Sequence, residues 1–408
     1  MCGVLALIYP KGCSPSSRQL ERIVNRMSHR GPDGMGVRIS GEIGFAHRRL
    51  AIIDVLDATQ PMVLPSGIKV TFNGEIYNFR ELRSTLIGCG HSFKYDSDTE
   101  VLLHAAEQWG PDCLNRLEGM FSLVVDDPIR GITWAARDRM GQKPLFAFDK
   151  RFFADIEHGF VSELKCILPE QNCNRVVSPN AVSRFLAYDF MPDSDGFFVG
   201  VQKVAPGELW VIDRDNLSKK PIRKKWYNLP FGRLDKVNKH QAIEQLDEQL
   251  DIATQRCMVA DVPLGIFLSG GIDSSLITAY ACRHINPNSL KTFSIGFNNP
   301  AFDESIYAQN VANHLGTKHH NLSVDSSDLL NIVPRILSAQ DEPFADPSII
   351  PTAILSRFAR EEVTVALGGD GGDELFLGYP TFVAENILSY FSWVPPEVFS
   401  NLANFAHQ

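Results

Sequence analysis

The sequence has no run of the roughly 18 apolar residues that a membrane-spanning helix needs, and no basic residue precedes its first apolar run. It therefore predicts neither a membrane span nor a signal peptide. Its eight cysteines form no C-x-x-C pair and no zinc-ligand spacing, so most are expected to be small buried residues in a reducing cytoplasm. Aspartate and glutamate (48) outnumber lysine and arginine (39), and this acidic balance argues against a nucleic-acid partner.

The chain is long enough for two or more domains, because single cores rarely exceed about 250–300 residues and this chain has 408. Up to about residue 210, short strand-like runs mix with helical patterns at 16–30 and 98–110, which is typical of an α+β domain with antiparallel sheets. Residues 211–237 are polar and basic and are predicted to be a linker. From residue 238 strands alternate with helices, which predicts an α/β domain with a doubly wound parallel sheet.

The stretch "LSGGIDSS" at 268–275 places two glycines between an apolar strand pattern and the start of a helix. Backbone N–H groups at a helix start lack partners, and glycine lets an oxyanion approach them closely. Serine hydroxyls can donate to phosphate oxygens, and Asp273 can hold magnesium. The alternative is a tight turn whose serines only cap the helix.

The string S-G-G-x-D-S resembles the pyrophosphate-binding loop of the ATP pyrophosphatase family, whose members cleave ATP to adenylate a substrate. A second motif, "GGDGGDELFLGY" at 368–379, again follows a predicted strand at the edge of the sheet where such folds bind ligands. Asp373 matches the metal-binding aspartate of that family. An acidic surface loop is the alternative, and magnesium coordination is the preferred interpretation.

The chain begins Met-Cys-Gly. Removal of Met1 would make Cys2 the terminal residue, with a thiol nucleophile beside an α-amine whose ordinary pKa, about 7.7–8.0, suits a general base. Many chains begin Met-Cys by chance, so this feature alone is weak.

Four motifs downstream support a catalytic Cys2: "RGPD" at 30–33, "AHRRLAIID" at 46–54, "FNGEIYN" at 72–78 and "SDTE" at 97–100. In order and spacing they resemble the glutaminase domain of class II glutamine amidotransferases, which are N-terminal-nucleophile hydrolases with an αββα core. "SELK" at 162–165 and "ARDRMGQKPLF" at 136–146 extend the likeness. Arg30 and Asp33 can also simply pair in a turn, and Asn-Gly at 73–74 is also a strong hairpin signal.

The order of these motifs along the whole chain resembles the glutamine-hydrolysing asparagine synthetase family. The resemblance implies a glutaminase domain at 2–210, the linker at 211–237, and an ATP-binding domain at 238–408. Its implied glutaminase residues are Cys2, with Asn73 and Gly74 as oxyanion donors, Arg49 for the glutamine carboxylate, and Glu75 and Asp98 for its ammonium. The implied ATP-binding residues are Phe267, Leu268, Ser269, Gly270, Gly271, Asp273, Ser274, Ile295, Gly368 and Gly369. Magnesium is assigned to Asp273 and Asp373, and Glu342, Asp346, Asp370 and Glu374 are candidates for the metal or the acceptor.

The implied reaction uses ATP and Mg²⁺. Glutamine hydrolysis releases ammonia, which travels internally to an acyl-adenylate formed from ATP and a carboxylate, with aspartate as the first candidate. Family members continue beyond the point where this sequence ends, so the second domain is expected to be shortened. Three alternatives stay open: another carboxylate acceptor such as a sugar acid, a glutaminase whose second domain only binds nucleotide, and an α/β protein with degenerate sites. No membrane partner is expected, and a homodimer is left open.

Overall fold

The computed structural model describes residues 1–192, 195–230, 237–299, 301 and 303–390. These form two compact units, one of Met1–Pro263 with Asp325–Val365, the other of Leu264–Val324 with Ala366–Gln408. Residues 231–236 of the predicted linker and 391–408 of the predicted second domain lie outside the described part. No described helix combines the length and the apolar character needed to cross a membrane.

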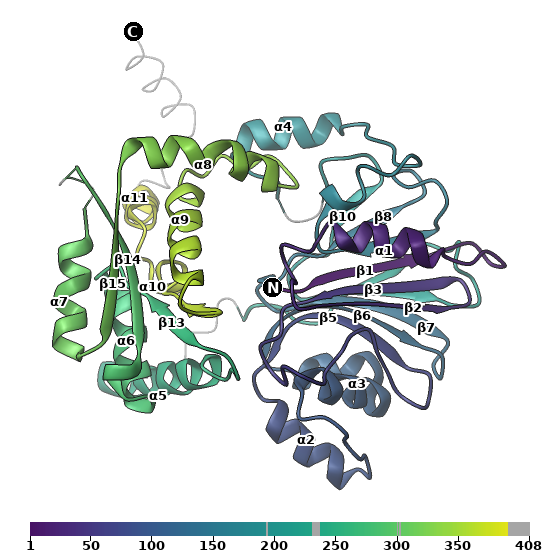
Figure 1. The fold of residues 1–408 in the computed structure, drawn as a ribbon, viewed down its shortest axis with the longest axis horizontal. Coiled ribbons are helices and arrows are strands. Elements are labelled where there is room, and N and C mark those ends of the chain that lie inside the picture. Colours follow the sequence, from purple (N-terminus) through teal and green to yellow (C-terminus); the bar gives the residue numbers. More distant parts are fainter. Residues whose placement is uncertain (193–194, 231–236, 300, 302, 391–408) are drawn as a thin grey trace. The chain divides into compact units, whose positions relative to one another are not determined.

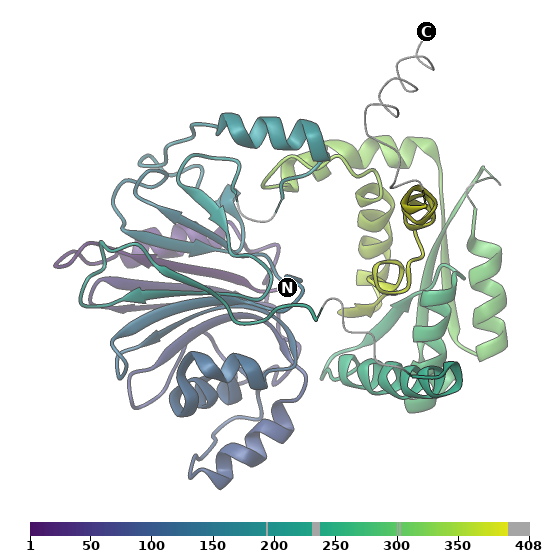
Figure 2. The ribbon, with the colours of Figure 1, turned by 180° about the vertical axis from the view of Figure 1, so that it is seen from behind.

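The first unit contains two six-stranded sheets whose paired strands are antiparallel (Figure 1, and from behind in Figure 2). The first sheet has the order β10-β8-β9-β1-β3-β2, with the bounds β1 Gly3–Ile8, β2 Gly34–Ser40, β3 Ile43–Arg49, β8 Phe146–Asp149, β9 His158–Val161 and β10 Val201–Lys203. The second has the order β12-β11-β7-β6-β5-β4, with the bounds β4 Met62–Val63, β5 Lys69–Ile76, β6 Gly119–Asp127, β7 Ile132–Arg137, β11 Glu208–Asp213 and β12 Ile222–Lys225.

Strand β1 explains how the two sheets stack. All six of its residues are buried. Because side chains alternate along a strand, Val4 and Ala6 point into a core shared with Val124 of the second sheet, whereas Leu5 points to the other face. Helix α1 (Ser17–Asn25) packs on that other face, and α2 (Phe79–Gly88) and α3 (Asp98–Trp109) pack on the outer face of the second sheet. The layers are therefore helix, sheet, sheet, helix, and the predicted αββα sandwich is confirmed.

The helical patterns at 16–30 and 98–110 appear as α1 and α3, and Gly110 ends α3 as expected. The other helical segments of the first unit are η1 Gly110–Arg116, η2 Leu164–Cys166, α4 Pro179–Tyr188, α5 Lys239–Cys257, α8 Ser326–Ala339 and α9 Ile349–Arg360. Strands β11 and β12 run into the segment predicted as a linker and pair within the second sheet. The domain boundaries themselves stay a prediction.

The second unit is built on a sheet with the order β15-β14-β13-β16, in which β13, β14 and β15 run parallel. Its elements are β13 Leu264–Phe267, α6 Ile272–His284, η3 Pro287–Ser289, β14 Lys291–Phe297, α7 Ser305–Leu315, β15 Lys318–Val324, β16 Val365–Leu367, α10 Gly372–Phe376 and α11 Pro380–Ser389. The chain moves from β13 outward to β15 and then returns to the opposite side of β13. This reversal creates a switch point between β13 and β16, where open α/β sheets bind ligands beyond the strand ends. The predicted combination of an α+β unit and a parallel α/β unit is confirmed.

The first unit contains a buried ion pair, and removing one of its partners should lower the free energy of unfolding. Lys69 on β5 faces Asp126 on β6, and both side chains are almost fully buried. Asp126 also accepts from Thr133 at 3.0 Å and lies 3.2 Å from Arg214. Lys69→Met removes one partner and leaves the carboxylate buried, which typically costs about 3–5 kcal/mol; Arg214 should hold the loss near 3 kcal/mol.

Urea denaturation of the Lys69→Met variant measures this loss. The matched control is Lys150→Met, at an exposed lysine that pairs with Glu157, where a change below about 1 kcal/mol is expected. Equal losses in the two variants would contradict a special cost of the buried charge.

Candidate functional site: a buried thiol cluster and a double glycine turn

Cys2 lies just before β1 and is held through three of its groups. Its N–H donates to Asn73 Oδ1 at 2.9 Å, and its carbonyl accepts from Arg30 Nε at 2.8 Å. Its Sγ accepts the N–H of Leu50 at 3.4 Å. Burial raises the pKa of the Cys2 thiol, and the Leu50 hydrogen bond opposes this only in part. The thiol is therefore fixed in place but needs a base before it can act as a nucleophile.

Asn73 and Gly74 lie inside β5, so the hairpin alternative for this Asn-Gly pair is wrong. The long strand pairing of β5 with β6 overrides the local turn signal. A Cβ at Gly74 would lie 2.0 Å from the carbonyl oxygen of Met120, so only glycine fits. Because Oδ1 of Asn73 accepts from Cys2, the amide nitrogen Nδ2 is left as a donor; it is buried and has no partner among the described residues. A buried donor without a partner is costly unless it serves a ligand.

Two acids, Asp98 and Glu75, interact with each other at the end of β5. Asp98 is the first residue of α3, and Ser97 caps this helix by accepting the N–H of Glu100. The Oδ2 atom of Asp98 accepts the N–H of Ile76 at 3.0 Å. Burial raises the pKa of Asp98 to about 6. Burial also raises the pKa of Glu75 well above its usual range, and the charge of Asp98 adds to this. Two neighbouring buried carboxyls of this kind favour binding of a cation.

Arg49 belongs to the same cluster, since its charge lowers the pKa of Cys2, Glu75 and Asp98 against the larger effect of burial. Its terminal nitrogens donate to the backbone carbonyls of Ile53 and Val55 at 3.2 and 3.0 Å, and also to that of Asp54. The guanidinium therefore organises the loop that follows β3 in addition to supplying positive charge.

The motif comparison assigned no role to Arg30 or Lys143. Arg30 does not pair with Asp33, as the turn alternative supposed; it donates to the Cys2 carbonyl and to Glu163 Oε1, each at 2.8 Å. Asp33 instead accepts the N–H of Ala51. Lys143 is buried close enough to Glu75 for their charges to interact, and burial lowers the pKa of its amine. Two strings gave the available signal: "SELK" contains Glu163, the partner of Arg30, and "ARDRMGQKPLF" contains Lys143.

In the second unit, the 269–275 turn closes on itself through serine. Ser269 N–H donates to Ser274 Oγ at 3.2 Å, and the two hydroxyls are 3.0 Å apart. Gly270 has φ +86°, and a Cβ there would lie 2.6 Å from the backbone of Ala308, so both conformation and space require glycine. Gly271 is the N-cap of α6, which leaves the start of this 13-residue helix without side-chain capping.

The second glycine motif meets this turn. A Cβ on Gly369 would lie 2.9 Å from Asp273 Cβ, and one on Gly372 would lie 2.6 Å from Asp273 Oδ2. The loops that follow β13 and β16 therefore converge on Asp273, as their position at the switch point requires. The carboxylate of Asp370 lies against Gly368, and that of Asp373 lies against Gly378. Both acids therefore contact glycines of the same motif. Glu374 accepts from the Tyr379 hydroxyl at 3.0 Å.

Other predicted residues lie apart from this convergence. Leu268 is buried and packs on Ala308 and Ala312 of α7, while Phe267 and Ile295 lie on the neighbouring strands β13 and β14. Glu342 and Asp346 belong to the first unit. There Glu342 pairs with Lys203 at 2.9 Å and accepts the N–H of Phe197 at 3.0 Å, and Asp346 accepts the N–H of Ser348 at 2.8 Å.

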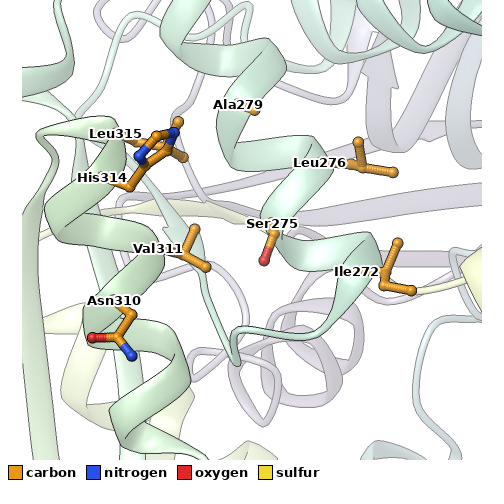
Figure 3. A pocket seen from close by; sticks show the side chains of 8 residues that line it. All are labelled: Ile272, Ser275, Leu276, Ala279, Asn310, Val311, His314 and Leu315. Atoms are coloured by element: carbon orange, nitrogen blue, oxygen red, sulfur yellow. The ribbon is translucent and has the colours of Figure 1, made fainter.

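A pocket of about 570 Å³ lies between α6 and α7. Figure 3 shows apolar side chains of both helices around it. Its lining residues are Ile272, Ser275, Leu276, Ala279, Asn310, Val311, His314 and Leu315. Two of them, Ile272 and Ser275, belong to the 269–275 turn, although none of the eight is among the predicted ATP-binding residues.

Two family models match the chain. One is described as a glutamine amidotransferase domain and matches residues 1–227; the other is described as asparagine synthase and matches residues 245–408. Glutamine-hydrolysing asparagine synthetase 1 of Bacillus subtilis is 34% identical over 402 residues, which cover 97% of this chain and 61% of that protein. A Methanocaldococcus jannaschii protein provisionally named glutamine-hydrolysing asparagine synthetase 2 is 33% identical over 404 residues, covering 93% of this chain and 76% of its own. The chain thus spans about three fifths of the length of the B. subtilis relative.

The raised pKa of Asp98 predicts a pH-dependent stability. The folded state holds the Asp98 proton up to about pH 6, whereas the unfolded carboxyl releases it near pH 3.8. The stability that protonation provides is therefore complete below about pH 4 and is lost as the pH rises through 6. Asp98→Asn avoids the cost of a buried charge, and its advantage over the natural protein should grow between pH 4 and 6, by at most about 1.4 kcal/mol per pKa unit.

Denaturation curves of both proteins across this pH range measure the difference. Asp96→Asn, at a mostly exposed carboxylate, is the control and should show no such growth. A difference that stays flat or shrinks with rising pH would contradict burial as the cause.

Proposed function

Because the chain belongs to the glutamine-hydrolysing asparagine synthetase family, we propose that it moves the amide nitrogen of glutamine to a carboxylate acceptor, aspartate, at the expense of ATP. The observation that carries the proposal is the geometry around Cys2. Asn73 Oδ1 accepts the Cys2 N–H, and its buried Nδ2 has no partner among the described residues.

In the first half-reaction, removal of Met1 converts the Cys2 N–H into a free α-amine beside Asn73 Oδ1. Burial lowers the pKa of the Met1 amine to about 6, which supports a neutral amine near pH 7 at this end of the chain. A neutral Cys2 amine can take the thiol proton, directly or through one water. The sulfur then attacks the glutamine amide carbon. The amine gives the thiol's proton to the leaving nitrogen, which departs as NH₃ when the carbon–nitrogen bond breaks. Water hydrolyses the resulting thioester to glutamate and restores the thiol.

The tetrahedral intermediate carries a negative oxygen that needs donors. Asn73 Nδ2 is a buried, fixed amide with no other partner among the described residues, and the Gly74 N–H is its neighbour on β5. Donors held in place before the reaction stabilise the oxyanion without reorganisation.

Glutamine also brings an α-ammonium and an α-carboxylate. Glu75 and Asp98, whose pKa values burial raises, would bind the ammonium, because a positive ligand offsets the cost of two buried negative charges. Arg49 would meet the carboxylate together with the loop at 53–55 that it organises.

In the second half-reaction, the α6 start at 269–275 would bind ATP phosphates through backbone N–H groups and serine hydroxyls. Asp273 and Asp373 fit a magnesium ion, which usually binds one or two carboxylates together with substrate phosphates. Bound there, Mg²⁺ would neutralise phosphate charge. ATP and aspartate would form β-aspartyl-AMP and pyrophosphate, and ammonia from the first site would displace AMP. We retain residues 2–210 as the glutaminase domain, 211–237 as the linking segment and 238–408 as the ATP-binding domain.

We also propose a cytoplasmic location, which is supported by the eight cysteines, all of them free thiols in the structure.

The glutaminase proposal predicts that Cys2→Ala abolishes glutamate release, while ammonia-dependent amide synthesis continues. Asn73→Ala should lower kcat for glutamate release about 10²–10³-fold by removing one oxyanion donor. Cys13→Ala, at an exposed thiol, is the control and should keep full activity. Mass spectrometry should find mature protein without Met1. Retained Met1 in active enzyme would rule out the amine as base.

The synthetase proposal predicts the reverse for Asp273→Ala: glutamate release persists and ATP-dependent pyrophosphate release is lost. Glu385→Ala, an exposed acid on α11, is the matched control. If Asp273→Ala releases pyrophosphate at the wild-type rate, the assignment of ATP binding to the 269–275 turn is wrong. If aspartate and a panel of other carboxylates all give no pyrophosphate while glutamine is hydrolysed, the second unit binds nucleotide without synthesis.

A further inference from the structure

Three side chains converge in the first unit, away from the residues used above. His91 lies just after α2, and His104 and Glu107 lie on α3. The two Nδ1 atoms are 3.1 Å apart, and each lies 3.4 Å from Glu107 Oε2. Within the described ranges, no other set of three or more His, Cys, Asp or Glu side chains brings its ligand atoms within 4.8 Å of one another.

These separations match a known coordination geometry. Zinc is bound tetrahedrally, with bonds of about 2.0–2.1 Å to imidazole nitrogen and to carboxylate oxygen, which places neighbouring ligand atoms about 3.3–3.4 Å apart. The three distances in the structure, 3.1, 3.4 and 3.4 Å, are close to the edges of that tetrahedron.

The orientation of His91 is fixed by two hydrogen bonds. Its backbone N–H donates to the Leu86 carbonyl at the end of α2, at 3.1 Å. Its Nε2 lies 2.8 Å from Gln108 Oε1, which can only accept. Nε2 therefore carries the proton, and Nδ1 presents its lone pair towards His104 and Glu107. Zinc-binding histidines typically have an outer partner of this kind on the second ring nitrogen.

His104 is prepared by the helix and by its surroundings. It lies three residues before Glu107, so the two side chains share one face of α3. The ring of Phe93 packs against it edge-on, with centroids 4.7 Å apart, and excludes water from that side.

We propose that His91, His104 and Glu107 bind one Zn²⁺ ion, with the fourth position left to water. Two neutral imidazoles and one carboxylate form a nitrogen-rich set that suits zinc and not magnesium, which prefers oxygen ligands. The ion joins the loop after α2 to the middle of α3. Because α3 begins at Asp98, the same ion steadies the segment 92–97 that leads to Asp98. This proposal stands independently of the proposed function.

Isothermal titration of ZnCl₂ into this 408-residue chain, stripped with EDTA and held in excess Mg²⁺, tests the site. The natural protein should take up one zinc that magnesium does not displace. Gln108→Leu, which removes only the outer partner, should weaken binding about 10–100-fold, and His104→Gln, which removes a ligand, should weaken it by more. His240→Gln is the matched control, because His240 also lies beside a glutamate, Glu244 at 3.3 Å, but has no third ligand; it should bind zinc like the natural protein.

Glu107→Gln provides a second ligand variant at a more exposed position, in case His104→Gln does not fold, and thermal denaturation by circular dichroism reports folding. Zinc held by a thiol such as Cys2 would be lost in Cys2→Ala and retained in His104→Gln and Glu107→Gln. Wild-type zinc affinity in a folded ligand variant, or no zinc uptake by the natural protein, would overturn the proposal.

Discussion

The position of Cys2 depends on a buried ion pair that does not contain it. Arg30 donates to the Cys2 carbonyl and to Glu163, and Glu163 is also 3.0 Å from Lys165. A chain end without such a partner is usually poorly ordered. Arg30 holds the carbonyl of Cys2 and Asn73 accepts from its N–H, so both backbone polar groups of this residue are hydrogen-bonded. The thiol can therefore be placed before any substrate arrives.

The same region holds several ionisable side chains whose charged forms are unfavourable because they are shielded from water. Glu75 and Asp98 have raised pKa values because they are desolvated, and Lys143 has a lowered pKa for the same reason. The opposite charges of Lys143 and Glu75 partly offset these costs. Burying these groups costs the first unit stability, which the apolar cores on both faces of each sheet offset.

The sequence predicts those parts of the fold in which local pattern and tertiary packing agree. The helix predicted at 98–110 appears at 98–109 because its apolar period, the Ser97 cap and the Gly110 stop all favour the same element. It fails where long-range pairing decides, as at Asn73-Gly74, where β6 extends a strand through a turn signal. It also cannot show that Arg30 meets Glu163, because 133 residues separate them. The pairing of β9 with β1 places Glu163 beside the start of β1, where Arg30 contacts Cys2. His104 and Glu107 have readable helical spacing, but His91 joins them only through the path of the loop after α2.

The loop after β3 connects these observations along the chain. Arg49 organises its carbonyls at 53–55, the Asp54 N–H donates to Asp261 Oδ2 at 2.8 Å, and the Asp261 N–H donates to Ile52 at 2.9 Å. Asp261 lies three residues before β13, the strand that leads into the 269–275 turn. The loop after β3 is therefore hydrogen-bonded to the segment of the first unit that precedes β13. The Asp54 carbonyl accepts from Arg49, and the Asp54 N–H donates to Asp261. A change that releases Arg49 from this carbonyl would therefore also weaken the hold of the loop on Asp261.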